Sequence, residues 1–167
     1  MDLYFLRHGI AVEPGTLGCK DDRERPLTSD GRRKLARIAA AMAAMEISFD
    51  LILSSPCVRA RQTAGIVARS LRVEKRLAFT ETLAVGGDPR ALIQEIRRRE
   101  PEPQRVLLVG HEPGLSRLIS RLIAGGSGAG VTLKKGGLCR LTTPALKYDR
   151  CATLEWLLAP KQMALMT

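Results

Sequence analysis

The sequence predicts an α/β fold in three layers, α/β/α, with a mostly parallel central sheet and helices on both of its faces. One observation is that short apolar runs, typical of buried strands, alternate along the chain with amphipathic segments of helical period. This alternation implies a mostly parallel sheet with right-handed crossovers, and sheets of this class carry helices on both faces. The length of 167 residues also suits one domain covering residues 1–167.

The first half of the chain contains two strand-helix units. Residues 3–6 and residues 51–53 are apolar runs that end at polar residues, as buried strands do. Thr28 suits the N-cap of the helix between them, and a second helix follows Pro56. The stripes that should pack on the sheet are Leu35, Ile38, Ala39, Met42 and Met45 in the first helix, and Ala60, Ala64, Val67 and Leu71 in the second.

The alternation continues in the second half. After a looser segment at residues 77–79, Asp88-Pro89 is expected to begin a helix, and residues 106–109 form the most apolar strand. Pro113 suits the first turn of the helix that follows this strand. The stripes expected for these helices are Leu92, Ile93 and Ile96, and then Leu115, Leu118, Ile119 and Leu122.

The last part of the chain is expected to close the sheet. The glycine-rich run at residues 125–130 follows a helix rather than a strand, so we interpret it as a flexible connection and not as a phosphate-binding loop. Residues 138–142 and 153–158 have the pattern of two antiparallel strands.

The charge balance favours anionic partners. Lys and Arg number 27 against 17 Asp and Glu, which gives a net charge of +10. Such a field attracts phosphoryl groups, acidic protein surfaces or nucleic acid. An aromatic content of 4% argues against a nucleic-acid reader, because those proteins commonly stack bases on exposed rings.

Metal, disulfide and membrane signals are weak. The four cysteines contain no CxxC pair and the chain has two histidines, so we expect reduced thiols, no metal site and no cofactor. The N-terminus lacks the pattern of a signal peptide, and the apolar helical segment at residues 38–45 is far shorter than a bilayer span. We therefore expect a cytoplasmic protein with no membrane partner.

Polar signals follow three of the expected strands. His8 follows the first strand, the Ser54-Ser55-Pro56 turn follows the second, and His111 follows the strand at residues 106–109. In parallel sheets ligands bind beyond the carboxyl ends of the strands. These residues should therefore meet at one edge of the sheet.

Together these residues can form a cationic phosphate cage. Arg7 offers a planar fork of donors for phosphate oxygens, and Gly9 lets the backbone approach and presents its N–H. Arg59 lies in the first helical turn after Pro56, where the helix N-terminus faces the same anion. Nearby positive charge lowers the pKa of an imidazole, which favours the neutral, nucleophilic form. This arrangement requires no metal.

The alternative is that each feature is structural. A histidine at a strand end is more often a hydrogen-bonded structural residue than a catalyst, and an Arg beside a carboxylate is usually a solvated surface group. The two histidines, however, both end apolar strands beside a glycine, and Arg7 adjoins one of them. That combination favours a catalytic interpretation.

Four blocks of sequence resemble the histidine phosphatase superfamily, in the branch that contains the phosphoglycerate mutases. The blocks are Arg7-His8-Gly9-Ile10-Ala11, Arg25-Pro26-Leu27-Thr28, Ser55-Pro56-Cys57-Val58-Arg59-Ala60-Arg61-Gln62-Thr63-Ala64 and Gly110-His111-Glu112-Pro113-Gly114-Leu115-Ser116. They occur in family order and reach to about residue 120. The resemblance is greatest to the small SixA-type phosphohistidine phosphatases, and it implies a phosphoglycerate mutase-like fold.

The resemblance also implies roles for individual residues. His8 would accept the phosphoryl group as a phosphohistidine intermediate, while Arg7, Arg59 and His111 would bind and polarise that group. Water would then release inorganic phosphate. Arg25 matches the Arg of the Arg-Pro-Leu-Thr block and would reach the phosphate or the substrate. The equal alternative for Arg25 is an ion pair with Asp21 or Asp22.

Glu81 stands where relatives that attack alkyl phosphates have a general acid. An imidazole leaving group has a pKa near 6.5, whereas an alkoxide resembles water with a pKa of about 15.7, so N–P cleavage needs less acid assistance. A direct role for Glu81 and the absence of one therefore both remain open. Glu112, beside His111, is expected to orient neighbours or cap a helix rather than take a catalytic step.

These observations lead to a metal-independent phosphohistidine phosphatase acting on a phosphoprotein. Because a chain of this length leaves little for insertions that roof a deep pocket, we expect an open cleft that admits a protein side chain. The runner-up is hydrolysis of a small phosphomonoester, and a different class is a noncatalytic basic module that binds phosphoprotein or nucleic acid. Mutase activity is disfavoured because it needs a closed site.

We expect a monomer, because nothing in the sequence demands an oligomer.

Overall fold

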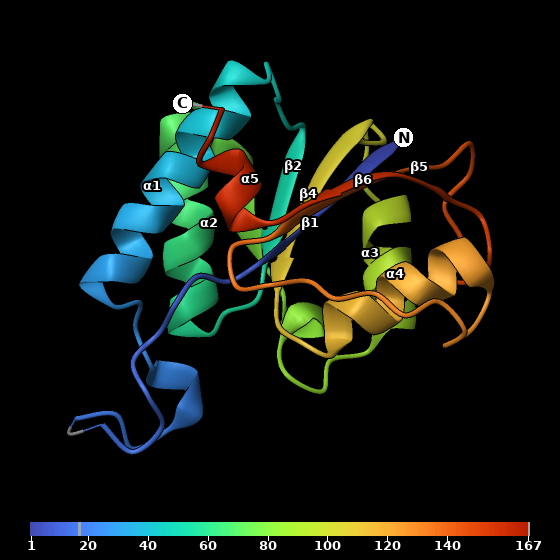
Figure 1. The fold of residues 1–167 in the computed structure, drawn as a ribbon. Coiled ribbons are helices and arrows are strands. Elements are labelled where there is room, and N and C mark those ends of the chain that lie inside the picture. The colour runs from blue at the N-terminus through green and yellow to red at the C-terminus, as the bar shows by residue number, and fades with distance from the viewer. Residues whose placement is uncertain (17, 167) are drawn as a thin grey trace.

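A computed structural model describes residues 1–16 and 18–166 (Figure 1). The strands are β1 (Asp2–Arg7), β2 (Leu51–Ser54), β3 (Leu77–Phe79), β4 (Arg105–Gly110), β5 (Leu138–Thr142) and β6 (Thr153–Leu158). The α-helices are α1 (Ser29–Ala44), α2 (Val58–Ser70), α3 (Pro89–Arg97), α4 (Gly114–Ala124) and α5 (Pro160–Met163). Short 3₁₀ helices are η1 (Asp22–Glu24), η2 (Glu74–Arg76) and η3 (Glu81–Leu83).

The strands of the described residues form one mixed sheet in the order β3-β2-β4-β1-β5-β6. Strand β4 pairs in parallel with both β1 and β2, and β3 extends this parallel part at one edge. Strands β5 and β6 pair antiparallel at the other side. The predicted α/β fold with a mostly parallel sheet is therefore confirmed.

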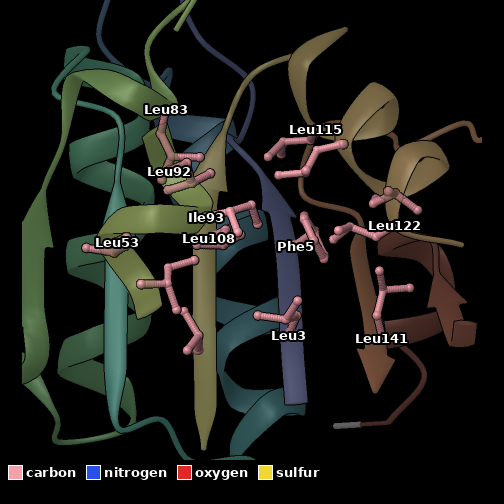
Figure 2. Packing of buried hydrophobic residues seen from close by; sticks show 14 of the residues in the cluster. Leu3, Phe5, Leu53, Leu83, Leu92, Ile93, Leu108, Leu115, Leu122 and Leu141 are labelled. Atoms are coloured by element: carbon pink, nitrogen blue, oxygen red, sulfur yellow. The ribbon is translucent and has the colours of Figure 1, made fainter. Parts of the chain in front are cut away.

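Helices cover both faces of the sheet, as predicted. In Figure 1, α1, α2 and α5 lie on one face, while α3 and α4 lie on the other. Each face of the sheet has its own apolar core. Strand β1 contributes side chains to both, because successive side chains of a strand point to opposite faces. Leu3 and Phe5 pack with the helices α3 and α4 (Figure 2), and Tyr4 and Leu6 pack with α1 and α2.

The predicted helix starts follow the expected local chemistry. The side chain of Thr28 accepts a hydrogen bond from the backbone N–H of Gly31, which caps α1. Asp88 caps α3 in the same way through the N–H of Arg90, and Pro89 occupies the first helical turn. These caps satisfy backbone donors that the helix itself leaves unpaired.

Three details differ from the sequence prediction. Residues 77–79 are a strand, β3, whose position at the edge of the sheet leaves it half-exposed and without a strong apolar pattern. Pro113 is the N-cap of α4 rather than a residue of its first turn. The short helix α5, with Pro160 at its start, was not predicted, because four residues carry too little periodicity.

Replacing Phe5 with alanine should destabilise the fold strongly. The Phe5 ring is 0% exposed between the sheet and the helices, so its loss leaves a cavity that costs about 3–5 kcal/mol. Phe79→Ala is the matched control, because Phe79 is 48% exposed and packs its ring mainly against Arg61, and it should cost about 1 kcal/mol or less. Urea unfolding measures both, and equal losses would contradict the core assignment.

Candidate active site

The register of three parallel strands brings the candidate residues together. Arg7 of β1 stands opposite Gly110 of β4, so the residues that follow, His8 and His111, leave the sheet side by side. The backbone N–H of His8 donates to the Gly110 carbonyl at 3.1 Å, and the two imidazole rings lie 5.0 Å apart between centroids. On the other side of β4, the N–H of Ser55 donates to the Val109 carbonyl at 2.9 Å. The predicted meeting of these residues at one edge is confirmed.

His8 presents a neutral ring with one nitrogen directed into the site. Its side chain is 7% exposed, and Nδ1 lies 2.7 Å from the carbonyl oxygen of Gly9. A carbonyl can only accept, so Nδ1 carries the proton and Nε2 keeps its lone pair. Burial lowers the pKa of His8 to about 3, and the nearby His111 ring and the charges of Arg59 and Arg7 add to this effect.

Arg59 faces the free nitrogen of His8. Its side chain is 3% exposed, and Nε donates to Nε2 of His8 at 3.3 Å. The guanidinium also donates to the backbone oxygen of Asp22 at 2.5 Å and to its carboxylate Oδ2 at 2.9 Å. The buried guanidinium of Arg59 therefore contacts His8, the candidate nucleophile, on one side and the carboxylate of Asp22 on the other.

Thr63 holds the loop after β1 against helix α2. Its hydroxyl donates to the backbone oxygen of Arg59 at 2.7 Å and accepts the N–H of Gly9 at 3.1 Å. We expected the N–H of Gly9 to face a bound anion, and this was wrong, because Thr63 takes it. Glycine is required for a different reason: a Cβ at position 9 would lie 2.5 Å from Cδ1 of Leu35.

His111 is buried beside Ser55. Its side chain is 5% exposed, and Nε2 lies 2.8 Å from the Ser55 hydroxyl. That hydroxyl accepts the N–H of Cys57 and can therefore donate its own proton to Nε2, which leaves the ring proton on Nδ1. Burial, followed by the charge of Arg59, lowers the pKa of His111 to about 4. Among the described residues, its Nδ1 has no hydrogen-bond partner.

Arg7 lies against the segment that precedes β5. One of its terminal nitrogens donates to the carbonyl oxygen of Leu133 at 3.0 Å, and its backbone pairs with Gly136 and Gly137. Its Nε is buried and has no partner within the described part of the chain. Buried polar groups are usually paired, so unpaired donors on Arg7 and His111 indicate a site that a polar ligand completes.

Arg25 and Glu81 lie outside this buried group. Arg25 forms an ion pair with Asp22 at 2.7 Å and donates to the Val12 carbonyl, which is the alternative that the sequence left open. Glu81 is 69% exposed and pairs with Arg23 at 2.7 Å. The described contacts of Glu81 therefore do not join it to either histidine.

Glu112 caps helix α4, as expected. Its carboxylate accepts the backbone N–H of Ser116 at 3.2 Å. From the sequence, Thr63 had no predicted role, Asp22 was named only as an alternative ion-pair partner of Arg25, and Ser55 stood out only as part of a turn. Thr63 stands one helical turn after Arg59, and this spacing is the signal that could have identified it.

A small apolar cavity adjoins His111. It has a volume of about 230 Å³ and is lined by α3, α4 and the loop between η3 and α3, with Leu83, Leu92, Leu115, Leu118 and Tyr148 among its walls. This is smaller than the usual range of ligand pockets, about 300–1,000 Å³. It has room for one side chain or a small substituent of a substrate.

Residues 1–16 and 18–166 contain no group of three or more His, Cys, Asp and Glu side chains that could hold a metal ion. No helix in that part of the chain is long and apolar enough to cross a membrane.

Comparison with known proteins decides the family. The family model of the histidine phosphatase superfamily (branch 1) matches residues 3–84, the part that contains His8 and Arg59. The chain belongs to the histidine phosphatase superfamily. The resemblance seen in the four sequence blocks is confirmed, and membership supports a phosphatase activity for this histidine phosphatase.

Two curated relatives extend over most of the chain. An uncharacterized protein of Picosynechococcus sp. is 34% identical over 150 residues, which are 89% of each chain. The phosphohistidine phosphatase SixA of Escherichia coli is 26% identical over 126 residues, which are 75% of this chain and 76% of SixA.

Solved structures of phosphatases share the fold. The protein histidine phosphatase SixA complexed with tungstate superimposes with a TM-score of 0.80 at 23% identity and covers 96% of this histidine phosphatase and 98% of SixA. An α-ribazole-5'-P phosphatase structure from Escherichia coli gives a TM-score of 0.69 at 21% identity, with 96% and 98% covered. At these identities the likeness establishes the fold alone.

The stability of this histidine phosphatase should fall as the pH drops below about 6.5. An unfolded histidine binds a proton near pH 6.5, whereas folded His8 and His111 stay neutral down to about pH 3 and 4. The unfolded state therefore binds more protons in this window, and each histidine contributes a slope of about 1.4 kcal/mol per pH unit. Urea unfolding from pH 4.5 to 7.5 measures it, and His8→Gln should show a shallower slope. An unchanged slope would contradict a neutral His8.

Proposed function

We propose that this histidine phosphatase hydrolyses phosphohistidine on a protein through a covalent phosphoryl intermediate on His8. The observation that carries the proposal is the state of His8: a neutral, buried ring whose proton lies on Nδ1 and whose Nε2 lone pair faces the guanidinium of Arg59. Arg7 adds a second positive charge, and Arg7 and His111 each have a buried nitrogen without a partner among the described residues. These features support a site that receives a phosphoryl group.

In the first step, the Nε2 lone pair of His8 attacks phosphorus. The new N–P bond forms as the bond between phosphorus and the substrate nitrogen breaks, and the electron pair stays on that nitrogen. The other nitrogen of the substrate ring carries a proton, so the ring leaves as a neutral imidazole. Arg7, Arg59 and His111 donate hydrogen bonds to the phosphoryl oxygens, where charge is spread in the transition state. Since the protein supplies this positive charge, the proposed reaction needs no metal ion.

In the second step, water attacks the phosphorus of the intermediate. The N–P bond to His8 breaks, its electron pair returns to Nε2, and the water proton leaves with the phosphate or to solvent. The hydrogen bond from Nδ1 to the Gly9 carbonyl keeps the ring in the tautomer that both steps need. Inorganic phosphate is the product.

The position of Glu81 supports nitrogen rather than oxygen as the leaving atom. Its carboxylate is exposed and paired with Arg23, and no contact in the described part of the chain joins it to either histidine. An imidazole with a pKa near 6.5 leaves without a strong acid, whereas an alkoxide does not. The likeness to a phosphohistidine phosphatase over three quarters of the chain also supports this substrate class.

A second candidate is a small phosphomonoester. The cavity of about 230 Å³ beside His111 favours it, since a small apolar substituent of an ester would fit there. The α-ribazole-5'-P phosphatase of the same fold supports this alternative.

Steady-state rates on a phosphohistidine-containing protein and on a panel of small phosphate esters separate the two candidates. We expect kcat/KM for the phosphohistidine protein to exceed that for the esters by about 10²-fold or more, because the leaving group needs no acid. Addition of EDTA should leave the rate unchanged. A preference for the esters would overturn the phosphohistidine proposal, and loss of activity in EDTA would overturn metal independence.

Replacing His8 with asparagine should abolish turnover. The asparagine amide cannot accept a phosphoryl group, so we expect a loss of about 10³-fold or more in kcat. An acid-labile phosphoenzyme, trapped from the wild type by rapid quench in alkali, should be absent from the variant. Retention of both would contradict His8 as the nucleophile, and a wild type without turnover would favour a noncatalytic binding module.

A further inference from the structure

The 3₁₀ helix η1 is joined to the site by two consecutive residues. Asp22 pairs with the buried guanidinium of Arg59, and Arg23 pairs with Glu81 through both carboxylate oxygens, at 2.7 and 3.0 Å. One short segment therefore contacts the arginine assigned to the phosphoryl group and the carboxylate that the family resemblance pointed to as an acid.

The Asp22 carboxylate binds the arginines as a phosphoryl group would. Its Oδ1 accepts from Arg25 and its Oδ2 accepts from Arg59, so one anion bridges two cations. Burial by itself would raise the pKa of Asp22, but the hydrogen bonds from Arg25 and Arg59 outweigh it and lower the pKa, so the group is ionised at neutral pH. Carboxylates and phosphates offer the same planar pair of oxygens to a guanidinium fork.

The side chains that attach η1 to the site lie at the surface, where another ion can replace them. None of its residues is buried, and the side chains of Asp22, Arg23 and Glu81 are each at least half-exposed. The Arg23–Glu81 pair is exposed on both sides and contributes little net free energy, whereas in the Asp22–Arg59 pair only the carboxylate is open to solvent. A dianionic phosphoryl group, with more charge than one carboxylate, can therefore replace Asp22 at Arg59.

We propose that Asp22 is an internal competitor for the anion-binding face of Arg59, and that a bound phosphoryl group displaces Asp22 and releases η1. This inference rests on the proposed function, because it takes Arg59 as a phosphoryl ligand. Displacement of η1 also separates Arg23 from Glu81. Asp22 thus sets how tightly phosphate binds.

Calorimetric titration of the protein with inorganic phosphate at fixed ionic strength tests the displacement. Asp22→Asn removes the competing charge and should lower the Kd for phosphate by about three- to tenfold. Arg23→Gln is the more discriminating variant, because it removes a positive charge and would weaken anion binding by simple electrostatics. If Arg23 holds η1 over the site, its loss should instead lower the Kd, by about twofold or more.

Two variants on helix α1 control for net charge. Asp30 and Arg33 form an exposed ion pair at 2.7 Å, so Asp30→Asn and Arg33→Gln repeat the same charge changes outside η1. Both should leave the Kd for phosphate within about twofold of the wild type. All four positions are solvent-exposed, and thermal unfolding checks that each variant is folded.

Tighter phosphate binding by both η1 variants, with unchanged controls, supports the displacement. Unchanged or weaker binding by Asp22→Asn would show that Asp22 orients Arg59, and weaker binding by Arg23→Gln would show that η1 is not tethered through Glu81. Either result overturns the proposal even if the wild type turns over phosphohistidine. Conversely, tighter binding in a protein without turnover overturns the proposed activity alone, and no phosphate binding in any variant overturns both.

Discussion

The parallel pairing of β4 with both β1 and β2 is the constraint on which the candidate site depends. Because the register sets Arg7 opposite Gly110 and Ser54 opposite Val109, the three strands end at one level and their next residues emerge together. A shift of one residue in either pair would turn a histidine or a serine toward the opposite face. The apolar cores on both faces hold this register, so packing far from the site positions the reactive groups.

Burial and positive charge act on the histidines in the same direction. Both effects lower the pKa of His8 and His111, so the rings stay neutral among arginines at the pH of the cell. As neutral rings with defined tautomers, His8 offers the lone pair of Nε2 and His111 offers the N–H of Nδ1. The cost is that buried groups are left without partners, as Arg7 and His111 show, and a phosphoryl group would satisfy them.

Two arginines near the candidate site are paired with a carboxylate before any ligand arrives. The net charge of +10 indicated an anionic partner, but Arg59 and Arg25 already share the Asp22 carboxylate. An anion that binds Arg59 therefore exchanges with the Asp22 carboxylate. This exchange couples phosphate affinity to the position of η1, a segment in which no residue is buried.

The sequence by itself determined the layers of the fold, the caps at Thr28 and Asp88, and the edge at which His8, Ser55 and His111 meet. These features follow from local periodicity and from the rule that parallel strands end at a common edge. Only the tertiary structure decided that Thr63 takes the N–H of Gly9, that β3 is an edge strand, and that Asp22 and Arg23 reach Arg59 and Glu81. Those contacts join residues that lie up to 58 positions apart, and periodicity within one segment carries no information about which distant side chains meet.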